Sequence, residues 1–149
     1  MILFFVGEFL FIGLVAAACI SGSNLFDFLD IPSLLMVVGG GFFVTIISFS
    51  FKDIGNAFAQ VFGESGERIE LRQAAYFWFA VIRNLLAVGA IGTLIGNIQM
   101  LGNLEDPSTI GPCMAISLIT FFYGIFFSGI LPLPAYYIIQ RRLANDSSE

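Results

Sequence analysis

Four long apolar stretches dominate the chain, and shorter polar segments separate them. A bilayer core about 30 Å thick needs about 20 apolar residues in a helix, and each stretch is about that long. Backbone polar groups in lipid must be satisfied within the segment, so each stretch is predicted to be a helix. The pattern therefore predicts a single all-α membrane domain over residues 1–149, with helices at 2–20, 31–51, 74–99 and 111–139.

The distribution of Lys and Arg predicts how these helices are oriented. Segments 21–30 and 101–110 carry acidic residues and no cation, whereas the connection 52–73 and the tail 140–149 hold all the cations except Arg83. Cytoplasmic connections of membrane proteins are enriched in Lys and Arg. Both termini and the connection 52–73 are therefore predicted to be cytoplasmic, and Arg83 is expected to snorkel toward that surface.

Composition narrows the class of function. Hydrophobic residues make up 58% of the chain and charged residues 11%, which does not fit a soluble domain. The net charge of -5 argues against nucleic acid as a partner. The sequence has no His, and Cys19 and Cys113 are too few for a metal site. No enzyme activity, catalytic residue, metal or cofactor is predicted.

The first stretch could be a lipoprotein signal peptide or a mature membrane helix. Residues 14–19 (LVAAAC) resemble a lipoprotein cleavage site, but no Lys or Arg precedes the apolar run, as a signal peptide would need. We therefore expect a mature helix. Glu8 lies about two turns into this helix, where an interfacial acid is expected rather than an ion relay.

The connection 52–73 is predicted to begin as an amphipathic helix at the membrane surface. Its apolar residues recur at helical spacing, and Gly63 and Gly66 then end the helix; the apolar residues are Ile54, Phe58, Val61 and Phe62. The charged residues that follow are expected to start the third helix. The segment is too short for a separate cytoplasmic domain.

The third helix contains a GxxxG pattern at Gly92 and Gly96, next to Thr93. Small residues allow two helices to approach closely in lipid, so plain packing is one interpretation of this face. Thr93 is singled out because its hydroxyl lies among glycines. Its alternative role is a hydrogen bond to its own helix backbone.

The fourth helix carries a stripe of small and polar residues, formed by Ser117, Thr120, Gly124 and Ser128, with Tyr123 beside it. The stripe predicts a close partner helix, and a hydrated path is the alternative. Neither helix 74–99 nor helix 111–139 contains an acidic residue. Ion transport through a membrane usually uses an ionisable group at mid-depth, so a partner protein is expected to supply the carboxylate.

Prolines mark the ends of the fourth helix. Pro107 and Pro112 bracket the outward connection and predict a helix start capped by Asp106 or Ser108. Near the cytoplasmic end, two further prolines at 132 and 134 predict a kink.

The chain resembles the MotA/TolQ/ExbB proton-channel family, and in particular its flagellar stator A-subunit branch. The resemblance rests on PSLL at 32–35 with GG at 39–40, on IGTLIG at 91–96, and on NLEDPS at 103–108 followed by IGP at 110–112. It covers all four predicted helices.

The resemblance implies a multi-pass protein of the bacterial inner membrane that forms a homopentamer around two copies of a single-pass MotB/ExbD/TolR-like protein. Ions pass along the partner's membrane Asp, and their flow is converted into mechanical work. By position, Thr93 and Thr120 would face that Asp, and Pro107 and Pro112 would shape the outer mouth. The same ion-path or partner-facing assignment extends to Gly92, Gly96, Ser117, Tyr123 and Gly124.

Two departures from the family pattern qualify these expectations. Sodium-driven members tend to carry two adjacent threonines in the fourth helix, and here Thr120 is followed by Phe121, which favours H⁺ over Na⁺. Stator members also carry a large cytoplasmic domain where this chain has only segment 52–73. A structural or assembly subunit that keeps the ring without the motor is therefore the alternative.

Overall fold

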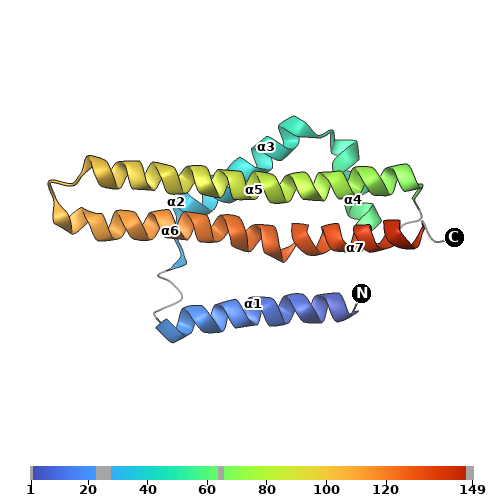
Figure 1. Cartoon of the computed structure of the whole chain (residues 1–149), viewed down its shortest axis with the longest axis horizontal. Coiled ribbons are helices and arrows are strands. Elements are labelled where there is room, and N and C mark those ends of the chain that lie inside the picture. The colour runs from blue at the N-terminus through green and yellow to red at the C-terminus, as the bar shows by residue number, and fades with distance from the viewer. Residues whose placement is uncertain (1, 23–27, 64–65, 147–149) are drawn as a thin grey trace.

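A long helical hairpin forms the spine of the protein in a computed structural model, which describes residues 2–22, 28–63 and 66–146 (Figure 1). The described residues are helical apart from short connections. The elements are α1 (Ile2–Gly22), α2 (Ile31–Leu34), the π-helix η2 (Leu35–Gly39), α3 (Gly40–Ser48), α4 (Phe51–Val61), α5 (Arg68–Gly102), α6 (Pro107–Ile130) and α7 (Pro132–Asn145).

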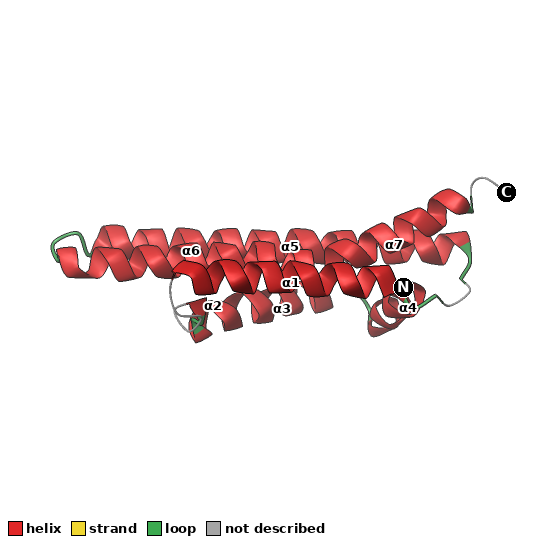
Figure 2. Cartoon of the chain, turned by 90° about the horizontal axis from the view of Figure 1, so that it is seen from below, coloured by secondary structure: helices red, strands yellow, loops and turns green. Residues whose placement is uncertain are grey.

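The elements form two layers, with α1 standing apart. Helix α5 runs antiparallel to α6 and α7, which follow one another along it (Figure 1). Seen from below, α2, α3 and α4 lie together on one side of this hairpin (Figure 2). The aromatic ring of Phe11 in α1 lies beside α6 at Gly129, where an added Cβ atom would be 3.8 Å from the ring.

Length and composition make three segments of the described residues capable of crossing a membrane: Ile31–Ser48, Arg68–Gly102 and Pro107–Asn145. A shorter apolar helical segment, Val6–Ser21, lies within α1. The prediction of an all-helical protein with apolar, membrane-type helices is thus confirmed for the part of the chain that is described. The number of crossings and their direction stay predictions.

Helix α5 is longer than the predicted helix 74–99. It begins at Arg68 because Glu67 and Glu70 form a capping box, in which each side chain accepts a hydrogen bond from the other residue's backbone N–H. At 1.5 Å per residue its 35 residues extend about 52 Å, well beyond a bilayer core. The end of the connection 52–73 is therefore part of α5.

The predicted helix 31–51 is divided in the structure. Its start is capped by Asp30, whose side chain accepts a hydrogen bond from the Ser33 N–H, and five residues then form the π-helix η2. The helix ends at Ser48, because Phe49 is extended and Ser50 forms a capping box with Asp53 that starts α4 in a new direction.

Helix α4 ends shortly before Gly63, whose φ of 94° is in the left-handed region that glycine readily adopts. It packs against α5 and α7 through a core that includes Ala57, Trp78 and Ile139. The Trp78 indole N–H donates to the Ala57 carbonyl oxygen at 3.2 Å. The amphipathic helix predicted for this connection is thus present, and its buried side faces α5 and α7.

The fourth predicted helix, 111–139, begins earlier and is interrupted. Asp106 caps α6, and Pro107 occupies its first turn. Helix α6 ends at Ile130, and α7 begins at Pro132 after Leu131. The predicted cap and the predicted break near the prolines are therefore present. Cys19 and Cys113 are free thiols.

Candidate functional site

The closest approach between α5 and α6 is a seam made of glycines on α5 and small or hydroxyl-bearing residues on α6. A Cβ atom added to Gly89 would lie 2.9 Å from the Cα atom of Gly124. Further along the seam, Cβ atoms added to the next two glycines would collide with the opposing side chains; these pairs are Gly92 with Thr120 and Gly96 with Ser117. The GxxxG pattern and the stripe of α6 thus pack against each other within one chain, as in other close helix pairs in lipid.

The two hydroxyl-bearing residues of α6 in this seam are almost completely buried, with exposed fractions of 1% for Ser117 and 2% for Thr120. The Ser117 hydroxyl donates to the Cys113 carbonyl oxygen at 2.9 Å. The Thr120 hydroxyl is 2.8 Å from both the Ile116 carbonyl oxygen and the Ser33 hydroxyl. Thr120 therefore connects α6 to α2, in addition to lining the seam.

Thr93 differs from these two residues because it is only half-buried. Its hydroxyl lies 2.9 Å from the Gly89 carbonyl oxygen and 3.1 Å from the Ser117 carbonyl oxygen. A hydroxyl group has one hydrogen to donate and two lone pairs that accept. Both neighbours are acceptors, so they orient the Thr93 hydrogen and leave the oxygen lone pairs open.

Tyr123 joins α6 to the segment before α2. Its hydroxyl donates to the Phe28 carbonyl oxygen and accepts a 3.1 Å hydrogen bond from the Asp30 backbone N–H. The phenol ring is buried. Tyr123 therefore positions the start of the second apolar segment against α6. It lies three residues along α6 from Thr120, which bonds to Ser33.

The π-helix η2 completes the wall of the site, and no residue of it was predicted as a site residue. The Met36 thioether lies beside Gly92, and the fully buried Val37 packs with Leu85 and Tyr123. Wide π-helical turns recur at functional sites in proteins. The sequence signal that could have drawn attention to this segment is the family-like motif that brackets it, with Pro-Ser at 32–33 and the glycine pair at 39–40.

Pro107 and Pro112 lie apart from the seam, toward the tip of the α5–α6 hairpin, and both are exposed. Next to them, Asp106 accepts hydrogen bonds from the Ser108 hydroxyl at 2.6 Å and the Ser108 backbone N–H at 3.0 Å. These bonds favour the ionised carboxylate and lower the pKa of Asp106 below its usual value.

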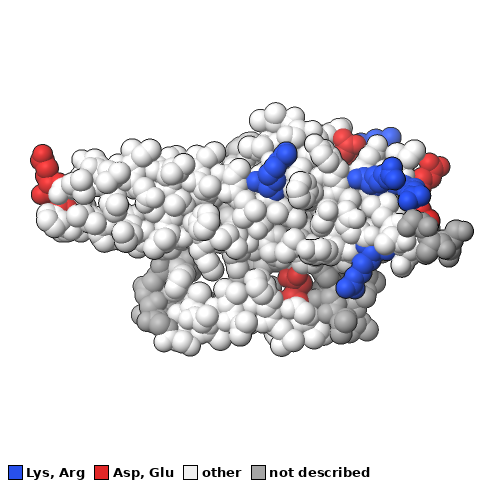
Figure 3. Space-filling view, in the orientation of Figure 1, with Lys and Arg blue, Asp and Glu red and all other residues white. Residues whose placement is uncertain are grey.

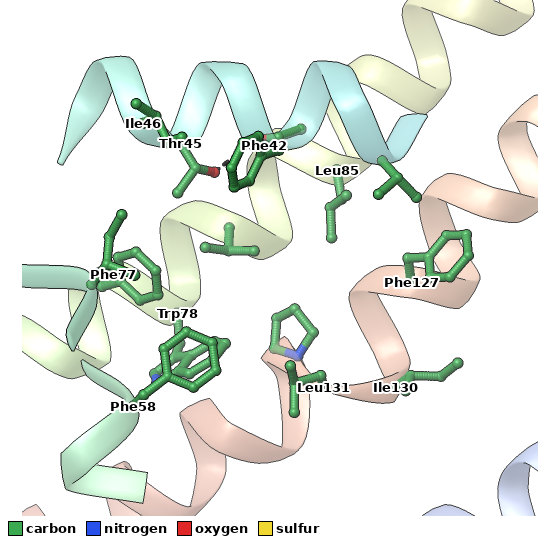
Figure 4. Close-up of a pocket in the computed structure, with 15 residues that line it drawn as sticks. Phe42, Thr45, Ile46, Phe58, Phe77, Trp78, Leu85, Phe127, Ile130 and Leu131 are labelled. Carbon is green, nitrogen blue, oxygen red and sulfur yellow. Dashed lines mark hydrogen bonds between the residues drawn. The ribbon is translucent and has the colours of Figure 1, made fainter. Parts of the chain in front are cut away.

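An apolar cavity of about 380 Å³ lies between α3, α4, α5 and the α6–α7 junction (Figure 4). Aromatic rings such as Phe77 and Trp78 form much of its lining. The Thr45 hydroxyl faces it but already donates to the Gly41 carbonyl oxygen at 2.7 Å. The cavity therefore offers no group that would carry an ion.

The seam as a whole supplies hydroxyl groups and backbone carbonyl oxygens and no ionisable side chain, since α5 beyond Arg83 and all of α6 contain neither acidic nor basic residues. Such groups can accept or relay hydrogen bonds but cannot hold a charge by themselves. The seam thus offers polar hydrogen-bonding groups between two apolar helices, without a charge of its own.

Comparison with known proteins shows which class of membrane protein this is. Residues 56–149 match the MotA/TolQ/ExbB proton channel family, and the chain belongs to this family. It is a family of channels rather than enzymes.

Part of the chain is similar to several bacterial motility proteins. The chain is 56% identical over 48 residues to "Motility protein A" of Aquifex aeolicus (strain VF5), and 48% identical over 48 residues to "Motility protein A" of Cereibacter sphaeroides and to "Chemotaxis protein PomA" of Vibrio alginolyticus. Each match covers 32% of this chain and 19% of the relative. The chain thus matches about a fifth of the length of these relatives.

Proposed function

We propose that this protein is the A-type subunit of a membrane motor driven by the ion-motive force. Five copies surround two copies of a single-pass MotB/ExbD/TolR-like protein in the bacterial inner membrane. The partner's membrane Asp binds the ion, and the ring converts ion flow into mechanical work. The observation that carries this proposal is the half-buried Thr93 hydroxyl, held by two carbonyl acceptors in a seam without charged groups.

Thr93 is suited to face the partner's carboxylate. Because its hydrogen is directed at the Gly89 and Ser117 carbonyl oxygens, its oxygen presents lone pairs to a protonated Asp or to the water that delivers the proton. The glycines on α5 let α6 pack closely against it, and this close packing brings the Ser117 carbonyl oxygen within reach of the Thr93 hydroxyl. Hydrogen bonds made or broken there change the proton affinity of an Asp.

The other predicted residues of the site surround Thr93 and hold it in position. Ser117, Thr120 and Tyr123 are buried and hydrogen-bonded within the subunit, so we assign them a positioning role. Pro107 and Pro112 shape the outer mouth at the hairpin tip. We favour H⁺ as the ion because Thr120 is followed by Phe121, which is 44% exposed and brings no second hydroxyl.

The proposed orientation places both termini and α4 on the cytoplasmic side. On the face drawn in Figure 3, Lys and Arg gather together with acidic groups over the end where α5 begins and α7 ends, whereas the opposite tip shows acidic groups without Lys or Arg. This distribution of Lys and Arg supports a cytoplasmic position for the end where α5 begins. The core between α4, α5 and α7 makes that end a compact unit for contact with the driven load.

A structural ring subunit without motor activity is the second candidate. It is favoured by the burial of Ser117 and Thr120 within the chain, which gives these residues a purely structural use. The two candidates differ in Thr93. A motor subunit needs its hydroxyl, whereas an assembly subunit needs only its volume.

The test compares Thr93→Val, which removes the hydroxyl at nearly constant volume, with Thr93→Ser, which keeps it. Proton uptake is measured with a pH-sensitive dye in vesicles that contain the native complex. We expect Thr93→Val to lower the flux about tenfold or more, as for the loss of a hydrogen bond to an ionic group. Thr93→Ser and the control Ser48→Ala, on an exposed face of α3, should conduct normally.

A complex that assembles but conducts equally well with Val at position 93 would contradict the ion-path role. Wild-type complexes that assemble as a ring and conduct nothing would favour the assembly subunit.

A further inference from the structure

Two charged residues lie within apolar helical segments and have no ion-pair partner among the described residues. Glu8 belongs to the apolar segment Val6–Ser21 of α1, and Arg83 lies on an exposed face of α5. The Glu8 Oε2 atom is buried without a hydrogen-bond partner, and the ion pair that the described residues contain joins Arg68 and Asp146 instead. An unpaired charge among apolar groups is costly, so each side chain would be stabilised by a partner of opposite charge.

The two charges lie at nearly the same depth. Gly124 faces Gly89 across the antiparallel α5–α6 seam, so Gly129, five residues further along α6, lies level with position 84 of α5. The outer atoms of the Phe11 ring in α1 lie close to Gly129, so the ring is near that level too. At 1.5 Å per residue, Glu8 lies about 4.5 Å from the level of Phe11, toward the start of α1. Arg83 lies about 1.5 Å from the level of position 84, toward the start of α5, which is the same end of the molecule.

The remaining offset of about 3 Å is within reach of an Arg side chain. Helical side chains tilt toward the N-terminus of their helix, and α1 and α5 begin at the same end of the molecule (Figure 1). The Glu8 carboxylate and the Arg83 guanidinium are therefore both displaced from their Cα atoms toward the end where the two helices begin. Within one subunit α6 and α7 lie between α1 and α5, so the two residues belong to elements on opposite sides of the hairpin (Figure 1).

We propose that Glu8 of one copy forms an ion pair with Arg83 of the adjacent copy, so that α1 clasps a second copy of this chain against the outer face of its α5. The opposite charges, their common depth and the position of α6 and α7 between α1 and α5 within one subunit carry this inference. It rests on the homo-oligomeric ring of the proposed function and adds the contact that closes it. Repeated around the ring, the pair neutralises every Glu8 and every Arg83.

Cross-linking between two tagged forms of the chain tests this contact. One form carries Glu8→Cys and the other Arg83→Cys, with both free thiols removed by Cys19→Ala and Cys113→Ala. The two forms are expressed together in membranes and treated with a short bifunctional thiol reagent. A product that carries both tags can form only between subunits, and we expect it to be the main product.

The matched control moves one thiol along α1. Leu14→Cys lies about 9 Å from the Glu8 level and should give little product with Arg83→Cys. In a second measurement, Glu8→Arg alone should lower the proportion of intact rings by native mass spectrometry at least severalfold. The exchanged variant Glu8→Arg with Arg83→Glu should restore it, which separates the loss of a pair from misfolding.

Intact rings with no cross-linked product above the Leu14 control would overturn the inference and leave the proposed function standing. Rings that the exchanged variant fails to restore would also count against the pair. Wild-type protein that runs as a monomer would overturn both the inference and the ring.

Discussion

Gly89 of α5 and Gly124 of α6 face each other so closely that the two backbones are in contact. A Cβ atom on Gly89 would be 2.9 Å from the Cα atom of Gly124, and one on Gly124 would be 3.1 Å from the Leu85 carbonyl oxygen. Only backbone atoms lie at this point, so no side chain can turn aside to make room. The pair therefore fixes the distance between the two helices that form the seam around Thr93.

Gly89→Ala is expected to destabilise the hairpin by about 1–3 kcal/mol, because overpacking against backbone forces the helices apart. The loss should exceed the gain of about 1 kcal/mol that Ala brings to a helix interior. Thermal unfolding in detergent, followed by the fluorescence of Trp78, measures the change. Trp78 is the chain's single tryptophan.

The matched control is Gly111→Ala on α6, where an added Cβ atom meets nothing within 4 Å. This variant should unfold at the wild-type temperature or above it. If Gly89→Ala were equally stable, the close contact between the backbones would not be needed.

Thr120→Val is expected to destabilise the protein by about 1–3 kcal/mol, since it leaves the buried Ser33 hydroxyl without its 2.8 Å partner. Thr120→Ser keeps that hydrogen bond and should lose less. The measurement is the unfolding midpoint in detergent, together with hydrogen exchange of the amides in α2 and η2. Unchanged exchange there would show that the Thr120–Ser33 contact does not hold the two segments together.

Asp106 should make the hairpin tip sensitive to acid. Its pKa is lowered in the folded protein by hydrogen bonds from the Ser108 hydroxyl and N–H, so ionised Asp106 stabilises this turn above its unfolded pKa. That contribution is lost as the pH falls through the folded pKa. Ser108→Ala should raise the pKa of Asp106 toward its usual value, whereas Ser108→Thr should keep it low.

The titration can be followed by NMR of the Asp106 side-chain carboxyl carbon in isotopically labelled protein. An identical titration midpoint in Ser108→Ala would mean that the Ser108 hydroxyl does not stabilise the carboxylate.

Local sequence signals predicted much of the helical framework. Asp106 before Pro107 marked the start of α6, and Pro132 marked the break that separates α7. Both are chemical signals contained within a few residues of chain, where a cap or a missing N–H acts directly. The glycines of α5 and the polar stripe of α6 were likewise recognised as packing faces.

The contacts that build the site depend on residues far apart in sequence. Tyr123 bonds to Phe28, 95 positions away, and Thr120 to Ser33, 87 positions away, and no local pattern specifies either pairing. The π-helical turn at 35–39 was also not predicted, because apolar periodicity reads it as ordinary helix. These features arise when whole helices pack against one another. A window of neighbouring residues carries no information about such packing.

The proposed motor is a ring of this chain around a partner that carries the ion-binding Asp, so the number of copies in the native complex is the decisive quantity. The complex would be extracted in mild detergent and its mass measured by native mass spectrometry, with particle imaging as a second count. We expect five copies of the chain enclosing two single-pass helices. A monomer or a dimer of the chain would contradict the proposed ring.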